Sequence, residues 1–444
     1  MNRDALGRID EVRANNQLLA DNVGYLPFGP MTSLTYGNGL NATNDFDQDY
    51  RLASQSIGNV FSQTYGYDLV NNITTITDTL TPANDQTFVY DALDRLETAD
   101  GNYGSLSYTY DPVGNRTSET NPTGTNTYSY DTTSQQLDSI TGNTNSSLSY
   151  DANGNLITQD NATYTYSDLN RLAQATANGQ TTDYLYNGRG ERTVKTDPSN
   201  TTLYHYDQSG LLLSETDEQG NSIRDYVYLN GQRLAILDDT GTYYIHSNHL
   251  DTPQVITDQN QTVVWQATYT PFGEANITTA SIENNLRFPG QYFDQETNLH
   301  YNYFRDYNPR LGRYTTSDPI GLDGGINTYS YAFQNPIRFV DLFGLNPTLT
   351  VVTVDRRVAD LGPRIPGGIV DSAVDIFVEV IINCECGGSD TNDLSFSIGL
   401  GLGEEVLLTQ SFSFTAPDAE SQADNALMNF TAEIAALDAR DFCE

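Results

Sequence analysis

The feature that most constrains the fold is a repeat of about 20 residues. An aromatic residue recurs at intervals of 16 to 23 positions, and in most copies an aspartate follows it. The aromatic positions are Phe46, Tyr67, Tyr90, Tyr110, Tyr130, Tyr150, Tyr166, Tyr186, Tyr206 and Tyr228. A period of this length is typical of repeat proteins, in which each unit packs on its neighbours and no unit is stable alone.

Each copy has the pattern of one β-hairpin. A second tyrosine or an apolar residue usually stands two places before the aromatic position, as in YTYD and LSYD. Residues two apart on a strand share one face, so each unit carries a short aromatic stripe. The segments 111–114, 151–154 and 207–210 place Asp first and Gly fourth, as in a type I turn. The sequence therefore predicts stacked hairpins in one large sheet, with the tyrosines serving packing.

The charge of the chain excludes one class of partner. The formal net charge is −37, and Lys195 is the only lysine in 444 residues. Nucleic-acid binding requires clustered Lys and Arg, so we expect no nucleic-acid partner. The start MNRDALGRIDEV has no apolar signal core, and no run approaches the roughly 18 apolar residues of a membrane-spanning helix. We therefore expect no signal peptide in this chain and no membrane role for the scaffold.

Two copies of D-x-x-G-L mark an internal border. DPIGL begins at Asp318 and DLFGL at Asp341, 23 positions later, and the Tyr-rich composition stops after the second copy. Two carboxylates that share a water can hydrolyse a peptide if one is protonated and the other ionised, because close like charges separate their pKa values. Spacing alone favours two turn aspartates, with Gly321 and Gly344 supplying tolerant backbone.

The repeat resembles the YD-repeat or rearrangement-hotspot (Rhs) family of bacterial polymorphic toxins and Tc toxin C subunits. The segments 243–274 and 286–322 resemble the Rhs-associated core domain of that family. The resemblance implies a mainly β fold, in which stacked hairpins form a large coiled sheet or partial shell before a small α+β C-terminal domain. We divide the chain accordingly into a hairpin array (1–240), a core domain with the cleavage motif (241–345) and a variable effector domain (346–444).

The same resemblance implies a function. Members of the family enclose a C-terminal toxin and release it by aspartyl autoproteolysis. Their catalytic aspartates match Asp318 and Asp341, a required arginine matches Arg313, and the cut falls between Leu345 and Asn346. This chain departs from the motif at Leu342, where many relatives have proline. The alternative is a non-cleaving surface or adhesion module whose repeats bind partners or carbohydrate.

Partners and localisation also follow from the resemblance. It implies secretion-system or Tc-toxin components, a cognate immunity protein, and a secreted or cell-surface location reached through a specialised secretion system. The shell portion is shorter than family members need for closure. Three interpretations of the chain therefore stay open: a fragment of a longer protein, a partial shell that needs a partner, or a displaced toxin cassette. We expect no cofactor and no metal, because the H-x-x-H pair His246 and His249 has no accompanying Cys or His cluster.

The tail has its own composition. Residues 346–444 contain four arginines, 17 acids, no lysine and no histidine, which gives a net charge of −13. A strict alternation over 394–403 followed by VLLTQSFSF predicts a hairpin with one apolar face. Helical spacing near the end predicts a covering helix through Ala423, Leu427, Phe430, Ile434 and Leu437.

The residue types of the tail also limit its chemistry. Without histidine it cannot be a His-metal nuclease or a Cys-His protease. Cys384 and Cys386 form a C-x-C pair, for which metal binding and a bond to Cys443 both stay open. The activity of the tail is therefore left open.

Overall fold

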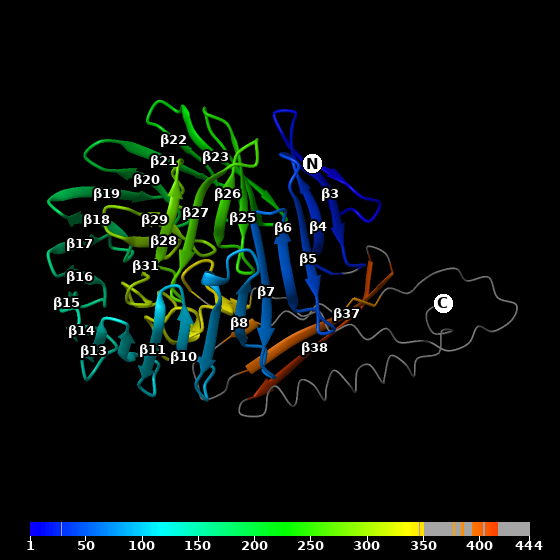
Figure 1. The fold of residues 1–444 in the computed structure, drawn as a ribbon. Helices are drawn as coiled ribbons and strands as arrows, with labels where there is room; N and C mark the ends of the chain where they lie inside the picture. Colours follow the sequence, from blue (N-terminus) through cyan, green and yellow to red (C-terminus); the bar gives the residue numbers. More distant parts are fainter. Residues whose placement is uncertain are drawn as a thin grey trace, which may run out of the picture. The chain divides into compact units, whose positions relative to one another are not determined.

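A computed structural model of the chain describes residues 1–27, 29–345, 347–349, 376–377, 383–385, 393–402 and 405–415 (Figure 1). The chain divides into two compact units, Met1–Val351 and Val352–Glu444. Asn346, the second residue of the predicted cleavage site, lies outside the described residues. So do Cys386, Cys443 and the predicted C-terminal helix.

The first unit is built on a sheet of 28 strands, in which each strand pairs antiparallel with the next along the chain. The strands are β1 (Asn2–Arg3), β2 (Ile9–Ala14), β3 (Gln17–Tyr25), β4 (Met31–Tyr36), β5 (Asn41–Phe46), β6 (Leu52–Ile57), β7 (Phe61–Tyr67), β8 (Ile73–Asp78), β9 (Gln86–Tyr90), β10 (Leu96–Gly101), β11 (Gly104–Tyr110), β12 (Arg116–Asn121), β13 (Gly124–Tyr130), β14 (Leu137–Gly142), β15 (Ser146–Tyr150), β16 (Leu156–Gln159), β17 (Ala162–Tyr166), β18 (Leu172–Ala177), β19 (Gln180–Tyr186), β20 (Arg192–Thr196), β21 (Thr201–Tyr206), β22 (Leu212–Thr216), β23 (Ser222–Leu229), β24 (Gln232–Leu237), β25 (Thr242–Ser247), β26 (Pro253–Thr257), β27 (Val263–Tyr269) and β28 (Ala275–Ala280). The predicted mainly β fold of consecutive hairpins is confirmed.

The turns form as the repeat predicted. In the turn after β11, the Gly114 N–H donates to the Asp111 carbonyl oxygen at 3.0 Å, and Gly114 has a φ of 86°. The Asp111 carboxylate also accepts the N–H groups of Val113 and Asn115, at 3.0 and 2.8 Å. Aspartate thus closes the turn with its side chain, and glycine supplies the left-handed conformation that the turn requires.

The repeat tyrosine has a second role besides packing. In β11 the alternate residues Leu106 and Tyr108 are buried, and Tyr110 continues this face to the end of the strand. The Tyr110 hydroxyl donates to the Leu96 carbonyl oxygen at the start of β10, at 2.8 Å. The equivalent bond to the preceding hairpin is made by Tyr25, Tyr67, Tyr90, Tyr130, Tyr186, Tyr206, Tyr228 and Tyr269. Each of these tyrosines therefore links two neighbouring strands through both its ring and its hydroxyl.

These two contributions of the tyrosine can be separated by substitution. Tyr110→Phe leaves the Leu96 carbonyl without its donor, and we expect a loss of about 1–2 kcal/mol in the free energy of unfolding. Tyr110→Ala also removes a large packed ring and should cost about 3–5 kcal/mol. Urea unfolding measures both values. Tyr50→Phe is the matched control, because the Tyr50 hydroxyl has no hydrogen-bond partner among the described residues; equal stabilities for the two Phe variants would contradict the second role.

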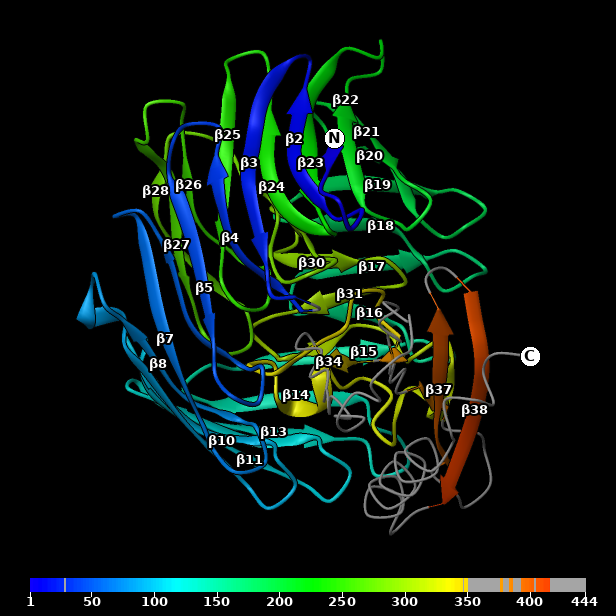
Figure 2. The ribbon, with the colours of Figure 1, turned by 90° about the vertical axis from the view of Figure 1, so that its right-hand side faces the viewer.

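The two ends of the sheet overlap without joining. Val12 and Leu34 from the first strands pack in one cluster with Leu234 and Tyr244 from β24 and β25. The Tyr36 hydroxyl crosses this contact and donates to the Ile245 carbonyl oxygen at 3.2 Å. Among the described residues, β28 pairs by ladder hydrogen bonds with β27 alone. The sheet is therefore a coil whose ends meet through side chains, as Figure 2 shows for β2–β4 beside β23–β25.

A core segment that follows β28 lies inside the curve of this sheet (Figure 2). It carries a second sheet of β29 (Tyr292–Asp294), β30 (Leu299–Asn302), β31 (Arg305–Asn308) and β32 (Arg313–Tyr314), then the 3-10 helices η2 (Gly321–Gly324) and η3 (Ala332–Gln334), and finally β33 (Phe339–Val340) paired with β34 (Thr348–Leu349). One further 3-10 helix, η1 (Pro82–Asn84), lies between β8 and β9. Leu299 and Leu311 pack against the inward tyrosines and leucines of β13–β19. Within the ranges described, no helix has the length and apolar composition to cross a membrane.

The second unit contains the hairpin that the alternating segment predicted. Strand β37 (Asp393–Leu402) pairs with β38 (Glu405–Thr415), and β35 (Ile376–Phe377) and β36 (Asn383–Glu385) both pair with β37. The four strands form one antiparallel sheet.

Candidate functional site

The core segment brings Asp318 and Asp341 onto one arginine. Arg305 Nη2 lies 2.8 Å from Asp318 Oδ2 and 3.3 Å from Asp341 Oδ2. Arg305 begins β31, Asp318 follows β32 and Asp341 follows β33. All three side chains are buried. A single guanidinium thus offsets the repulsion between two carboxylates that water does not screen.

The second D-x-x-G-L motif folds as a turn closed by its own aspartate. The Leu345 N–H donates to Asp341 Oδ1 at 2.9 Å. Gly344 has a φ of 68°, and a Cβ on it would lie 2.7 Å from the Asn302 carbonyl oxygen. The Gly344 carbonyl accepts a hydrogen bond from Arg305 Nε. The motif therefore holds Leu345 by the same two groups, Asp341 and Arg305, that make up the cluster.

The Leu345 carbonyl and the Asp318 carboxylate border the same small space beside Gly324. A Cβ placed on Gly324 would overlap with Asp318 Oδ2 and would lie 2.9 Å from the Leu345 carbonyl oxygen. Glycine at this position keeps open the gap between an acid and the carbonyl of the residue before the predicted cut.

Two further side chains hold Asp341 in place. The Tyr314 hydroxyl donates to Asp341 Oδ2 at 2.8 Å, and Asn302 Nδ2 donates to the Asp341 carbonyl oxygen at 2.9 Å. Asn302 Nδ2 also lies 2.7 Å from the Tyr314 hydroxyl, and the Arg305 guanidinium stacks 3.6 Å from the centre of the Tyr314 ring. The position of Asp341 is therefore set from several sides.

Burial changes the acidity of Asp318. Removal of the carboxyl from water raises the pKa of Asp318 to about 6, against the lowering effect of Arg305 and of the Ile320 N–H; the charge of Asp341 raises it further. A carboxyl with this pKa is protonated in about half of the molecules at pH 6 and in about a tenth at pH 7. It is suited to act as an acid beside a carbonyl oxygen.

Arg313, the arginine that the resemblance selects, occupies a different place. Its Nη2 donates to the Gln135 carbonyl oxygen at 2.5 Å, and its guanidinium lies between the rings of Tyr130 and Tyr329. In the described part of the chain it forms no ion pair with Asp318 or Asp341. The structure thus brings the two predicted aspartates and Leu345 together with Arg305 in place of Arg313. Arg305, Tyr314 and Gly324 carry no distinguishing spacing, so sequence reasoning missed them.

A solvent-open hollow borders the cluster. It has a volume of about 690 Å³, and Gln135, Ser317 and Thr328 are among its lining residues. Gln135 Oε1 accepts the Thr328 N–H at 2.9 Å, while the Thr328 carbonyl oxygen accepts both the Asp318 N–H and Arg305 Nη1, at 2.9 and 3.0 Å. The Thr328 backbone therefore links the lining of this hollow to Asp318 and Arg305.

The two histidines of the H-x-x-H pair bond elsewhere in the fold. His246 Nε2 pairs with Thr257 Oγ1 at 2.9 Å, and His249 Nε2 with the Ile337 carbonyl oxygen at 2.8 Å. The described residues contain no group of three or more His, Cys, Asp or Glu side chains that could hold a metal ion, around these histidines or elsewhere.

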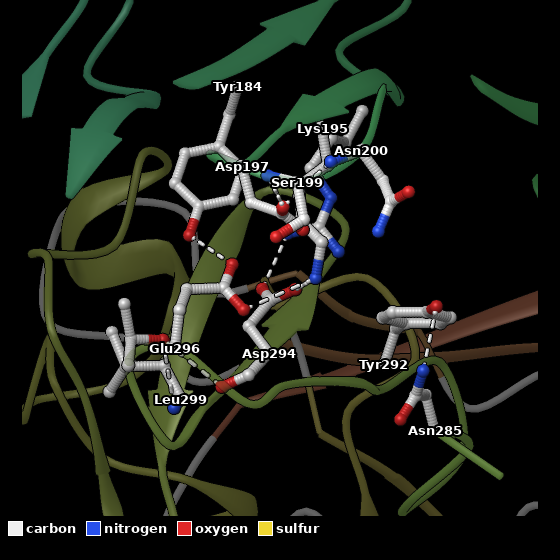
Figure 3. Close-up of polar contacts among 12 residues, drawn as sticks. Tyr184, Lys195, Asp197, Ser199, Asn200, Asn285, Tyr292, Asp294, Glu296 and Leu299 are labelled. Atoms are coloured by element: carbon white, nitrogen blue, oxygen red, sulfur yellow. Dashed lines mark hydrogen bonds and ion pairs between the residues drawn. The ribbon is translucent and has the colours of Figure 1, made fainter. Parts of the chain in front are cut away.

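A separate buried ionic network attaches the core segment to the sheet (Figure 3). Asp294 of β29 lies 2.5 Å from Arg192 Nη1 and 3.2 Å from Lys195 Nζ, both from β20. Glu296 pairs with Lys195 at 3.3 Å and accepts the Tyr184 hydroxyl at 2.7 Å. Burial opposes ionisation of Asp294, yet the two cations hold its pKa below the usual value. The two negative charges of Asp294 and Glu296 are matched by the two positive charges of Arg192 and Lys195. This balance indicates that the network serves to attach the core segment to the sheet.

Comparison with known proteins places these observations in a family context. The family model for the teneurin YD-shell matches residues 31–337. The chain is 29% identical over 310 residues to the double-stranded DNA deaminase toxin A of Burkholderia cenocepacia. This alignment covers 57% of this chain and 22% of that protein. The chain is 34% identical over 134 residues to the toxin protein Tse5 of Pseudomonas aeruginosa, covering 30% of this chain and 10% of that one. The chain thus spans about a fifth or less of the length of these relatives.

Solved structures share the fold. The Tc holotoxin pore of Photorhabdus luminescens matches with a TM-score of 0.63 and 21% identity, over 77% of this chain and 19% of that chain. The TcdB2-TccC3 crystal structure matches with a TM-score of 0.64 and 20% identity, over 78% of this chain and 21% of that chain. At this identity the likeness shows a common fold.

Proposed function

Because this chain belongs to the teneurin YD-shell family, we propose that it is the shell portion of a toxin-delivery protein that cuts itself between Leu345 and Asn346. The observation that carries the proposal is the meeting of Asp318 and Asp341 on Arg305, with the Leu345 carbonyl oxygen beside Asp318. The names of its relatives, which include several toxins, support the delivery role.

The proposed chemistry gives the two aspartates different tasks. Asp318, with its raised pKa, donates a proton toward the Leu345 carbonyl oxygen. Asp341 acts as the carboxylate and takes a proton from a water that adds to the Leu345 carbonyl carbon. As the carbon–nitrogen bond breaks, the Asn346 nitrogen receives the proton that Asp341 took from the water, and Asp318 recovers the proton that it gave to the carbonyl oxygen. One water is consumed, and a Leu345 carboxyl and an Asn346 amine are formed.

The turn of the second motif makes the reaction intramolecular. Asp341 holds the Leu345 N–H and Arg305 holds the Gly344 carbonyl, so the carbonyl to be attacked is positioned before the reaction begins. Positioning of this kind can lower the activation barrier by up to about 7 to 11 kcal/mol. Arg305 contacts Asp318, Asp341 and the neighbouring Gly344 carbonyl, so its charge can stabilise the negative charge that develops on the Leu345 carbonyl.

The domain division follows from this proposal. Residues 1–240 and 241–345 together form the shell with its cleavage site, and residues 346–444 are the released effector. The sheet itself continues across residue 240 to Ala280. The proposal includes components of a delivery system as partners of the shell and an immunity protein as partner of the effector, since relatives include a toxin protein and a Tc complex.

The test is the mass of the purified protein. Wild-type chain is expected to give two pieces after denaturation, the smaller beginning with Asn346, and to elute as one particle before denaturation. N-terminal sequencing and intact mass spectrometry measure the cut, and native size-exclusion chromatography measures retention. A single chain of full mass would leave the non-cleaving scaffold as the function.

A further inference from the structure

A second pocket lies between the sheet and the core segment, away from the cleavage cluster. It encloses about 570 Å³, which is within the range of small-molecule sites. The sheet contributes the turns at 159–162 and 177–178 and the start of β28, and the core segment contributes residues from Arg287 to Arg310. The pocket therefore has a floor made by the core segment and a rim made by the edge of the sheet.

The floor holds a buried cation with no acid beside it. Arg287 is 2% exposed. Its Nη1 donates to the carbonyl oxygens of Asn284 and Leu286, at 3.0 and 2.9 Å, and its guanidinium lies 4.5 Å from the centre of the Phe293 ring. Nε and Nη2 have no hydrogen-bond partner in the described part of the chain, and no carboxylate there forms an ion pair with Arg287. Burial and the charge of Arg233 lower the pKa of Arg287.

Of the seven other buried arginines among the described residues, five form ion pairs with carboxylates. Arg171 forms none there, but it donates to the carbonyl oxygens of Gly190 and Tyr303. Arg192 pairs with Asp294 at 2.5 Å, and Arg305 pairs with two aspartates. Arg313 has no carboxylate partner either, but the space that it borders has a volume of about 10 Å³, too small for a ligand. Because an unpaired buried charge is costly, the pocket in front of Arg287 is the place where an anion would be stabilised.

The acids that line the pocket are engaged or lie at its rim. Glu296 pairs with Lys195 and Tyr184, and Asp160 accepts hydrogen bonds from Ser146 and Ser147. Glu274 lies exposed at the rim. The floor is therefore cationic, while the exposed entrance carries both Glu274 and Arg310. The single unpaired guanidinium at the floor matches a ligand with one negative charge.

From these observations we propose that the pocket binds a small molecule with a single carboxylate and an apolar body. The free edge of the Arg287 guanidinium offers two parallel donors, which match the two oxygens of a carboxylate. Phe293, Ile277 and Ala162 supply apolar lining for the rest of the ligand. The volume accommodates a ligand of about 10 to 20 non-hydrogen atoms.

Benzoate is the probe, and its neutral isostere benzamide is the matched control. Isothermal titration of the folded protein is expected to give one benzoate site with a Kd of about 1 mM, and at least tenfold weaker binding of benzamide. Phthalate, with two charges, should bind more weakly than benzoate, because Arg287 offers donors for one carboxylate and the second would enter the pocket unpaired. The uncleavable Asp318→Asn chain should bind benzoate equally, which separates this site from the cleavage proposal.

Two variants locate the binding. Arg287→Gln should abolish benzoate binding, while Arg310→Gln, the same charge change at the exposed rim, should weaken it about threefold or less. Because Arg287 is part of the core, Ala162→Leu provides a second variant that fills the pocket without touching Arg287, and it should also abolish binding. Circular dichroism verifies folding. Equal binding of benzoate and benzamide, no saturable binding up to about 20 mM, or full binding in folded Ala162→Leu would overturn the proposal.

Discussion

Asp318→Asn and Asp341→Asn are each expected to leave the chain uncut and at full mass. An amide can neither donate the proton that Asp318 supplies nor accept the one that Asp341 takes, so each variant removes one half of an acid–base pair. Groups that act as one unit show large and non-additive losses, and we expect the rate of cleavage to fall at least about 10³-fold in either variant. The double variant should be no slower than the slower single one.

The control for this experiment is Asp323→Asn. Asp323 lies in η2, five positions after Asp318, and its side chain is exposed. This variant carries the same change of charge and should be cut like wild type. Intact mass spectrometry after a fixed time of cell-free synthesis measures the wild type and the four variants. Cleavage that persists in both Asn variants would return Asp318 and Asp341 to the role of turn residues.

Arg305→Met is expected to slow cleavage by about 10²- to 10³-fold, the usual effect of removing a group that stabilises developing charge. Arg305→Lys keeps the charge but loses the fork of donors that reaches Asp318, Asp341 and Gly344 together, so an intermediate rate is expected. Arg313→Met is the matched control, because Arg313 is also buried and, among the described residues, forms no ion pair with either aspartate. It should be cut within a few-fold of the wild-type rate.

The pH profile distinguishes a chemical role of Arg305 from a purely structural one. If Asp318 is the acid, wild-type cleavage falls about tenfold per pH unit above its pKa of about 6, because the protonated form is lost. Arg305 lowers that pKa, so in Arg305→Met the fall should begin at a higher pH. Rates follow from timed samples of cell-free product transferred to buffers of different pH. An unmoved profile, or a block in Arg313→Met with normal cutting in Arg305→Met, would assign the role to Arg313.

The choice between these two arginines could not be made from the sequence. Both lie in the segment NYFRDYNPRLGRY before the first D-x-x-G-L motif, and both are buried. Which of the two arginines reaches the aspartates depends on how β31 and β32 pair with each other. It also depends on where the chain places η2, next to Asp318, and β33, next to Asp341. These contacts join residues 13 to 36 positions apart, for which no local pattern exists. Gly324 was missed for the same reason, since its importance is that no side chain fills the space beside Asp318 and Leu345.

The sequence by itself determined the hairpin unit, its turns and the inward aromatic face. Alternation along a strand and Asp-to-Gly turn chemistry act within about 20 residues and therefore appear directly in the repeat. The two aspartates were visible as a repeated motif, but a catalytic role requires that their side chains lie close together, which the motif does not show. Only the tertiary structure decided which arginine joins them, that the repeat tyrosines also bond to the preceding strand, that the sheet ends overlap, and that Arg287 faces a pocket. Each of these features depends on contacts between residues that are far apart in the sequence, and no local sequence pattern specifies such contacts.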